Sequence, residues 1–357
     1  MSAASSSRLT PNRVAGGLLV ALALLAPLIF SEYWVATLLT QALFLGIVAA
    51  SLIFLSADGG MVSLAQVAIY GVAGFALGNL TTTGNTKGMN LGWDPVLGIV
   101  VAIAIAVVVA LVFGALASRS YGIYFLMITL VFSVIANLFF GQVTSVSGFG
   151  GISGIPIPEF FDRTAHPNRL YFATLLVAAL VYVGLRYVAR TPFGLALQGI
   201  RDDPVRMRSL GYSVALHRLL AFGLAGFVAA LAGILFVWWN AQIAPSTIDL
   251  TATINVLMIA VIGGMFRLEG AWIGALVFVL LNNYAQDVGF VGERFPTLIG
   301  LIFLVIVLVS PDGLVGLWER TVARLRGSAG PDGPTGEGGS AGTVPEGERG
   351  ASTVTGS

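Results

Sequence analysis

The chain has 357 residues, of which 57% are hydrophobic and only 10% are charged. Soluble domains are typically about 45–50% apolar and about 25% charged, so this composition excludes a soluble enzyme and a disordered protein. The formal net charge of +1 excludes a strongly basic nucleic-acid-binding protein. The absence of cysteine excludes disulfides and thiol chemistry. A polytopic membrane protein remains.

Ten segments approach the roughly 20 apolar residues that a helix needs to cross a bilayer. They are, in chain order, Val14–Phe30, Val35–Leu55, Met61–Leu80, Pro95–Ala117, Tyr121–Gly141, Leu170–Val188, Arg218–Trp239, Leu250–Gly264, Ala271–Tyr284 and Phe295–Ser310. We expect Met61–Leu80 and Leu250–Gly264 to be re-entrant or broken, because irregular backbone at membrane depth needs protein or water around it. The pattern predicts an all-α fold with a membrane domain over residues 14–312.

Ten spans place both termini on the same side of the membrane. If that side is the cytoplasm, 14 of the 18 Lys and Arg residues fall in cytoplasmic segments, as the positive-inside rule requires. Residues 1–13 then form a cytoplasmic N-terminal segment. Residues 313–357 are rich in Gly, Ser, Pro and Glu and predict a disordered cytoplasmic tail.

The predicted spans carry almost no ionisable residue, whereas transporters coupled to protons or sodium usually place such residues inside the bundle. The chain also lacks a Gly-x-x-x-x-Gly-Lys-Ser/Thr phosphate loop, so an ATPase that drives it must be a separate subunit. An ATP-independent channel or carrier is the alternative. With two histidines and no intramembrane carboxylate pair, we expect no catalytic site, no metal site and no cofactor bound by this chain.

Amides and glycines are the candidates for lining a solute path. The amides are Gln66, Asn137 and Asn255, although each can equally hold helices together through an interhelical hydrogen bond. The glycine-rich loop that contains Gly151 and Gly154 is too irregular for a lipid-facing helix, and we expect it near the mouth of a cavity. Three further glycines share one helical face, where they let neighbouring segments approach closely: Gly71, Gly74 and Gly78.

Residues 189–217 predict a cytoplasmic loop with two short amphipathic helices. Thr191 and Asp203 each precede a proline, the arrangement of an N-cap followed by the first helical residue. Gly211 stands where a helix ends in a left-handed residue. Such helices either lie on the membrane surface or dock into a groove of another protein.

Five motifs, in order over roughly residues 40 to 312, resemble those of the branched-chain amino-acid ABC importer permeases. In chain order they are the runs 59–71, 124–130, 147–156, 190–204 and 262–275. The run 190–204 is followed by Leu210-Gly211-Tyr212. The Gly-Ile-Ser-Gly-Ile-Pro run favours the M branch of the family over the H branch. The chain departs from the family pattern at Leu195, where an arginine is usual, at Phe266, where a glycine is usual, and over 204–208.

The resemblance implies a permease like those of type II ABC importers, with ten transmembrane or re-entrant helices, in the plasma membrane of a prokaryote. It would move branched-chain or related amino acids by alternating access. A second permease, expected to form a heterodimer, two cytoplasmic ABC ATPases that bind the ATP and an extracytoplasmic solute-binding protein would complete the importer within membrane lipid. The residues expected at the ATPase contact are Gly194, Ile200, Arg201, Asp202, Asp203 and Gly211. A permease of the same fold for urea, short amides or another small polar solute is the alternative.

Overall fold

The computed structural model describes residues 26–27, 31–83, 88–158, 161, 167–287, 300–301, 304 and 313–316. All of them belong to one compact unit, Met1–Glu319. Nearly all of the first and tenth predicted spans lie outside the described residues, as do the N-terminal segment and the tail beyond residue 316. The fold is therefore described for the segments between them.

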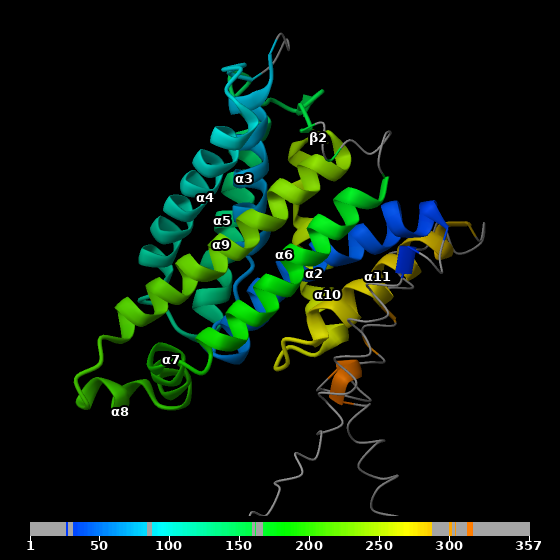
Figure 1. The fold of residues 1–357 in the computed structure, drawn as a ribbon. Helices are drawn as coiled ribbons and strands as arrows, with labels where there is room; N and C mark the ends of the chain where they lie inside the picture. Colours follow the sequence, from blue (N-terminus) through cyan, green and yellow to red (C-terminus); the bar gives the residue numbers. More distant parts are fainter. Residues whose placement is uncertain are drawn as a thin grey trace, which may run out of the picture. The chain divides into compact units, whose positions relative to one another are not determined.

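The described chain is almost entirely helical, as predicted (Figure 1). A π-helical turn, η1 (Trp34–Leu39), leads into α2. The helices are α2 (Thr40–Ala57), α3 (Gln66–Thr81), α4 (Pro95–Ala117), α5 (Gly122–Gln142), α6 (Pro167–Val188), α7 (Pro192–Asp202), α8 (Pro204–Ser209), α9 (Val214–Asn240), α10 (Leu250–Gly263) and α11 (Gly270–Asp287). Within the part of the chain that the structure describes, five helical segments are long and apolar enough to cross a membrane: Trp34–Ala57, Pro95–Ala117, Gly122–Gln142, Asn168–Val188 and Val214–Asn240.

The centre of this unit is formed by α2 and α9, which are buried along most of their length. α9 contacts α3 and α4 and also α2, and α2 in turn contacts α6, α10 and α11. Helices that are apolar on all sides are expected at such a position. Figure 1 shows α9 and α2 between α4 and α11.

Small residues bring α4 close to α9. The buried positions of α4 are glycines and alanines at regular spacing: Gly98, Ala102, Ala106, Ala110, Gly114 and Ala117. A Cβ atom added to Gly226 of α9 would lie 2.3 Å from the Cβ of Ala110, so the helices touch almost backbone to backbone. The opposite face of α4 exposes valines such as Val100 and Val108, as a lipid-facing surface does.

Two helices begin four or more residues from the predicted start. The segment after α2 is irregular through Ala65, so α3 starts at Gln66 rather than at Met61. With 16 residues it is about 24 Å long, shorter than a bilayer core of about 30 Å. α9 starts at Val214 rather than at Arg218, which puts that arginine inside the helix.

A pair of short strands was not predicted. β1 (Ile152–Ser153) and β2 (Gln242–Ile243) are antiparallel, with Ile152 opposite Ile243. Gly151 has φ +71°, and a Cβ atom there would lie 2.3 Å from the carbonyl oxygen of Ile243. Only glycine accommodates both the left-handed backbone and this approach.

The three glycines on one face of α3 make the close approaches that were predicted. An added Cβ atom would lie 2.1 Å from Ile248 at Gly71, 2.4 Å from Ile243 at Gly74 and 3.1 Å from Ile155 at Gly78. The partners belong to the 3-10 helix η3 (Pro245–Ile248), to β2 and to the segment just after β1. This glycine face of α3 therefore packs against η3, β2 and the segment after β1.

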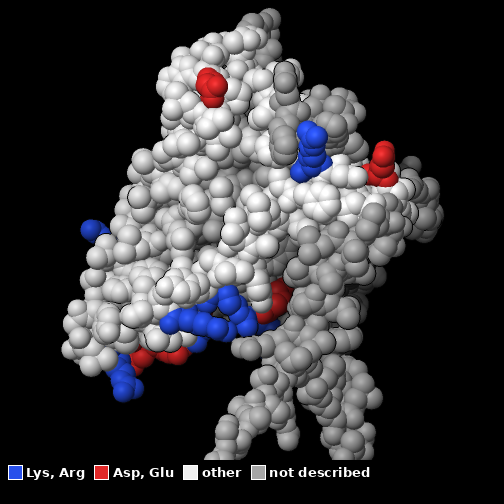
Figure 2. All heavy atoms as spheres, in the orientation of Figure 1, with Lys and Arg blue, Asp and Glu red and all other residues white. Residues whose placement is uncertain are grey.

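The loops alternate between two ends of this unit. Hydrogen bonds join residues of the loops after α2, α4, α6 and α10 at one end, which we call the α7–α8 end. The strand pair and η3 lie at the other, the β1–β2 end (Figure 1). This alternation matches the predicted order of spans. Figure 2 shows that most of the visible charged side chains gather over the α7–α8 end, below a wide uncharged surface.

Candidate functional site: the α7–α8 loop and its anchors

The loop between α6 and α9 folds into two capped helices, as predicted. The Thr191 hydroxyl accepts a hydrogen bond from the Gly194 backbone N–H at 3.4 Å, and the Asp203 carboxylate accepts from the N–H groups of Val205 and Arg206, both at 3.0 Å. Gly211 has φ +90°, the left-handed conformation expected at the end of α8. Local sequence signals thus define both helices.

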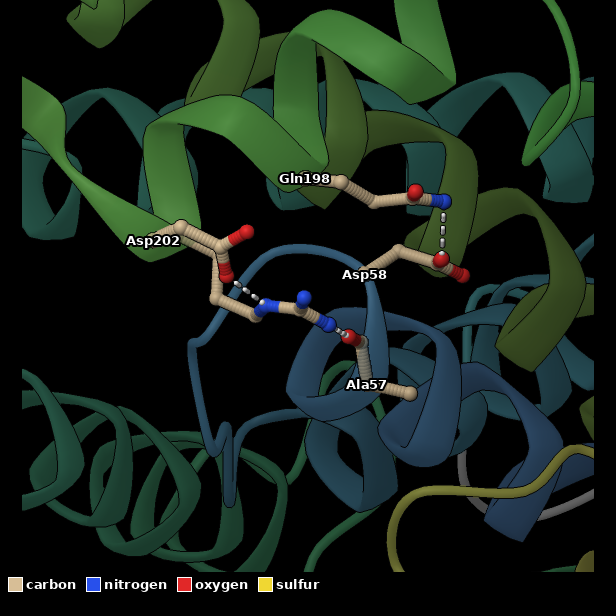
Figure 3. A network of polar contacts seen from close by, with 5 residues as sticks. Ala57, Asp58, Gln198 and Asp202 are labelled. Carbon is tan, nitrogen blue, oxygen red and sulfur yellow. Dashed lines mark hydrogen bonds and ion pairs between the residues drawn. The ribbon is translucent and has the colours of Figure 1, made fainter. Parts of the chain in front are cut away.

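α7 is fastened to the end of the central helix α2 (Figure 3). Gln198 donates a hydrogen bond from Nε2 to the Asp58 carboxylate at 2.8 Å. Arg201 donates from its guanidinium to the Ala57 carbonyl oxygen and pairs through Nε with Asp202 at 2.8 Å. A displacement of α7 therefore acts directly on the C-terminus of α2.

The turn after α2 is shaped to receive Arg201. Gly60 has φ +62°, and a Cβ atom there would lie 2.6 Å from Cγ of Arg201. Glycine supplies both the left-handed backbone and the space for the arginine stem. Burial raises the pKa of the nearby Asp58 carboxyl, against the opposing effects of the Gln198 hydrogen bond and the Arg201 charge.

The six residues expected at the ATPase contact do not share one surface. Gly194 and Ile200 are buried, and a Cβ atom on Gly194 would lie 2.2 Å from the Val188 carbonyl oxygen at the end of α6. They hold α7 to the helical bundle. Arg201 and Asp202 form the ion pair described above, while Asp203 and Gly211 are exposed at the two ends of α8.

Three large apolar side chains of the α7–α8 loop are exposed on its surface. Leu195 is 58% exposed, Val205 is 71% exposed and Leu210 is 65% exposed. The prediction that each helix is amphipathic holds for α7, whose other face is buried, but no residue of α8 is buried. An open apolar surface rimmed by charges is typical of a docking site for another protein.

The burial of Arg218 was not predicted from the sequence, because this residue was placed at the very start of a predicted span. It is 4% exposed, in the second turn of α9. Its guanidinium donates to the carbonyl oxygens of Ser118 at 3.0 Å and Ser120 at 2.8 Å, and lies 4.3 Å from the ring centroid of Tyr121. The signal was present in the spacing, since Val214, Arg218 and Phe222 occupy every fourth position on one buried face.

The candidate path residues lie in several separate segments of the described chain. Gln66 is buried at the start of α3, where its Oε1 accepts from the Ser51 hydroxyl at 3.4 Å and its Nε2 has no partner among the described residues. Asn137 of α5 donates to the Pro245 carbonyl oxygen at 2.7 Å. The remaining three are the half-buried Asn255 of α10, the buried Gly151 before β1 and the exposed Gly154 after it.

A cavity of about 380 Å³ lies elsewhere, between α3, α4, α5 and residues 89–91. Its lining is apolar except for Asn79, whose Oδ1 accepts from the Met89 N–H and whose Nδ2 donates to the Phe75 carbonyl oxygen, both at 2.8 Å. None of the candidate path residues lines it. With a single polar side chain in an otherwise apolar lining, this cavity is poorly suited to a polar solute.

Within the described ranges, no group of three or more His, Cys, Asp or Glu residues could hold a metal ion. The α7–α8 end instead carries two capped helices, a hydrogen-bonded carboxylate, a buried arginine and exposed apolar side chains. These groups are suited to receiving a partner and passing on its movement.

Comparison with known proteins gives the class. Residues 34–309 match the family described as "Branched-chain amino acid transport system / permease component", and the chain belongs to this family. It is thus a multi-pass membrane protein and a transport permease subunit rather than an enzyme.

Individual relatives agree with this assignment. The chain is 26% identical over 298 residues to the high-affinity branched-chain amino acid transport system permease protein LivM of Escherichia coli K12, an alignment that covers 75% of this chain and 68% of that protein. It is 24% identical to a probable LivM of Methanocaldococcus jannaschii over 72% of this chain and 81% of that protein. It is 21% identical to the fructose import permease protein FrcC of Rhizobium meliloti over 82% of this chain and 80% of that protein. No solved structure matches the chain significantly.

Proposed function

We propose that the chain is the membrane-spanning subunit of an ATP-driven importer and that α7 and α8 receive its ATPase. The observation that carries this proposal is the loop itself. It is built from two capped helices, exposes Leu195, Val205 and Leu210, and is hydrogen-bonded to the end of the buried helix α2. A plain connector needs neither the anchors nor the open apolar surface.

The proposed cargo is a branched-chain or related amino acid. The family description and the names of the LivM relatives support this class. A second candidate is another small polar solute such as a sugar, urea or a short amide, and the similarity to a fructose permease over most of both chains favours the sugar. Uptake of competing labelled solutes separates the two.

The proposed assembly contains a second permease, two cytoplasmic ABC ATPases and an extracytoplasmic solute-binding protein. ATP would be bound and hydrolysed on the ATPases. Their closure would displace α7 and α8, and that displacement would drive alternating access as a rigid-body movement of helices. This chain would bind no cofactor of its own.

The proposed orientation places the α7–α8 end in the cytoplasm, together with both termini. The arginines of the described chain support it. At or near the α7–α8 end are Arg119, Arg186, Arg190, Arg201, Arg206, Arg208, Arg218 and Arg267, whereas Arg169 lies near the start of α6 at the other end. Labelling of single introduced cysteines from either side of the membrane tests this orientation, since the chain has no cysteine of its own.

Co-purification tests the docking role of the loop. We expect two ABC ATPases and a second permease to co-purify with the wild-type chain and the ATPases to be lost from Val205→Glu/Leu210→Glu and from Asp202→Arg/Asp203→Arg. Phe266→Glu is the matched control, because Phe266 is an equally open apolar residue, 67% exposed, in the turn after α10. ATPases that remain bound to both loop variants would contradict the proposed docking site.

A further inference from the structure

Arg218 is a buried cation with no carboxylate partner among the described residues. Among the described residues its guanidinium has only neutral partners: the carbonyl oxygens of Ser118 and Ser120 and, through Nε, the sulfur of Met61 at 3.0 Å. Aromatic faces complete the site, with Cζ 4.3 Å from the Tyr121 ring centroid and 5.6 Å from that of Phe125. A buried arginine needs such a full set of partners, because burying a charge is costly.

These partners lie on three separate segments. Met61 belongs to the turn after α2, Ser118 and Ser120 to the turn after α4, and Tyr121 and Phe125 to the start of α5. Arg218 itself lies in α9, which follows the α7–α8 loop directly. The Arg218 side chain therefore connects the start of α9 to the turn after α2 and to the turn after α4.

Tyr121 extends the link to α8. Its hydroxyl accepts a hydrogen bond from Nη2 of Arg208 at 3.4 Å, while its ring faces Arg218. Arg208 is exposed on α8, one turn before Gly211. Tyr121 thus touches the loop on one side and the buried cation on the other, and it is the residue that immediately precedes α5.

α5 is suited to being moved from this end. Its inward face is held by polar contacts at every fourth residue, each to a different segment: Thr129 to the Leu64 N–H at 3.1 Å, Ser133 to the Thr253 hydroxyl at 2.9 Å and Asn137 to Pro245 at 2.7 Å. Much of its remaining surface is exposed, as at Tyr124, Met127 and Val131. Single hydrogen bonds of this kind are worth little each within a membrane bundle, so α5 can shift as a rigid rod.

We propose that Arg218 and Tyr121 form the joint through which a displacement of α8 reaches α5, which makes them positioning residues for transport. The joint fixes the start of α5 to the loop, and a shift of α5 changes its polar contacts with η3 and α10. This inference rests on the proposed function, since it names how the ATPase-driven loop moves α5.

The test is the number of solute molecules transported per ATP hydrolysed, measured on the assembled importer in proteoliposomes with labelled leucine. We expect Arg218→Met and Tyr121→Leu to assemble and hydrolyse ATP but to lower this ratio between about twofold and thirtyfold, the range of coupling changes along such networks. Arg218→Lys should recover part of the ratio because it restores the cation. Arg119→Met is the matched control: Arg119 is exposed in the same turn and has no hydrogen bond or ion pair within the described chain, so the ratio should not change.

A second readout separates coupling from stability. The cysteine-free chain permits spin labels at Ser209→Cys on α8 and Ile123→Cys on α5. We expect the distance between them to be the same in the nucleotide-free and ATP-trapped states of the wild-type background and to differ between these states in Arg218→Met.

The outcomes are distinguishable. If the wild-type assembly shows no ATP-driven uptake of any solute, the proposed function fails. If the wild type transports and Tyr121→Leu keeps the wild-type ratio, the joint is contradicted, and this holds even where Arg218→Met does not assemble. A wild-type label distance that changes with nucleotide also overturns the joint.

Discussion

Asp58, the residue that follows α2, accepts a 2.8 Å hydrogen bond from Gln198 in the middle of α7. The two residues lie 140 positions apart in the chain, yet they connect α2, a largely buried helix of the bundle, to the loop that we propose receives an ATPase. The carboxylate is half-buried, and burial raises its pKa against the opposing effects of the Gln198 hydrogen bond and the Arg201 charge. This contact can be tested through pH.

Asp58→Asn should change how stability depends on pH. Burial raises the pKa of Asp58 above 3.8 in the folded protein, so the folded state favours the protonated form. The wild type should lose stability as the pH rises from below 3.8 through the raised pKa, because the unfolded chain releases its proton first. The asparagine side chain of the variant would not titrate, and its amide oxygen can still accept from Gln198.

The measurement is the thermal unfolding midpoint of both proteins in detergent between pH 3 and pH 7. The difference in midpoint should move in favour of the variant as the pH rises through that window. A difference that stays constant, or that moves in favour of the wild type, would show that the folded state does not raise the pKa of Asp58.

Gly60→Ala should weaken the anchor of α7. Gly60 has φ +62°, and the new Cβ atom would lie 2.6 Å from Cγ of Arg201. The left-handed backbone alone costs about 1–2 kcal/mol for a non-glycine residue, and the displaced arginine adds to that. Gly154→Ala is the control for backbone strain, since Gly154 has φ +67° with nothing within 4 Å of its added Cβ.

Chemical denaturation of the two glycine variants separates the effects. Gly60→Ala should be the less stable of the two, and the excess should disappear when Arg201→Ala is introduced as well. Equal losses in both variants would mean that Arg201 does not occupy this turn.

Gly226→Val should disrupt the contact between α4 and α9. The added side chain would meet the Cβ atom of Ala110, which already lies 2.3 Å from the position of a Cβ on Gly226. Overpacking of a tight contact typically costs about 1–3 kcal/mol. Val108→Leu on the exposed face of α4 is the control and should leave stability unchanged, because Val108 is 59% exposed. Unfolding midpoints that are equal in the two variants would contradict the close approach.

The features that could be predicted from the sequence are those set by contacts between residues close together in the chain. Thr191 and Asp203 each bond to backbone N–H groups within three residues of themselves, and Gly211 ends its helix through its own backbone. Such contacts are independent of the rest of the fold, so the two helices could be placed without a structure. The apolar runs of α4, α5 and α6 are long enough to predict spans by composition alone.

Contacts between distant segments could not be predicted in this way. Ile152 pairs with Ile243 through two-residue strands, which carry no periodic signal of their own. Gly194 and Ile200 were expected at the ATPase contact, but both are buried in α7, where Gly194 lies against the end of α6. Arg218 was placed at the first residue of a predicted span, and its burial could not be predicted because its carbonyl and aromatic partners lie about a hundred residues away in the chain.

ATP-dependent uptake by the assembled importer tests the central claim most directly. Proteoliposomes that contain this chain, its second permease and the ATPases would be supplied with the binding protein and labelled leucine, with ATP on the ATPase side. We predict uptake that requires both ATP and the ATPases, and that is lost in Val205→Glu/Leu210→Glu but retained in Phe266→Glu. Uptake by this chain in vesicles without the ATPases would contradict the account and identify a channel or an ATP-independent carrier.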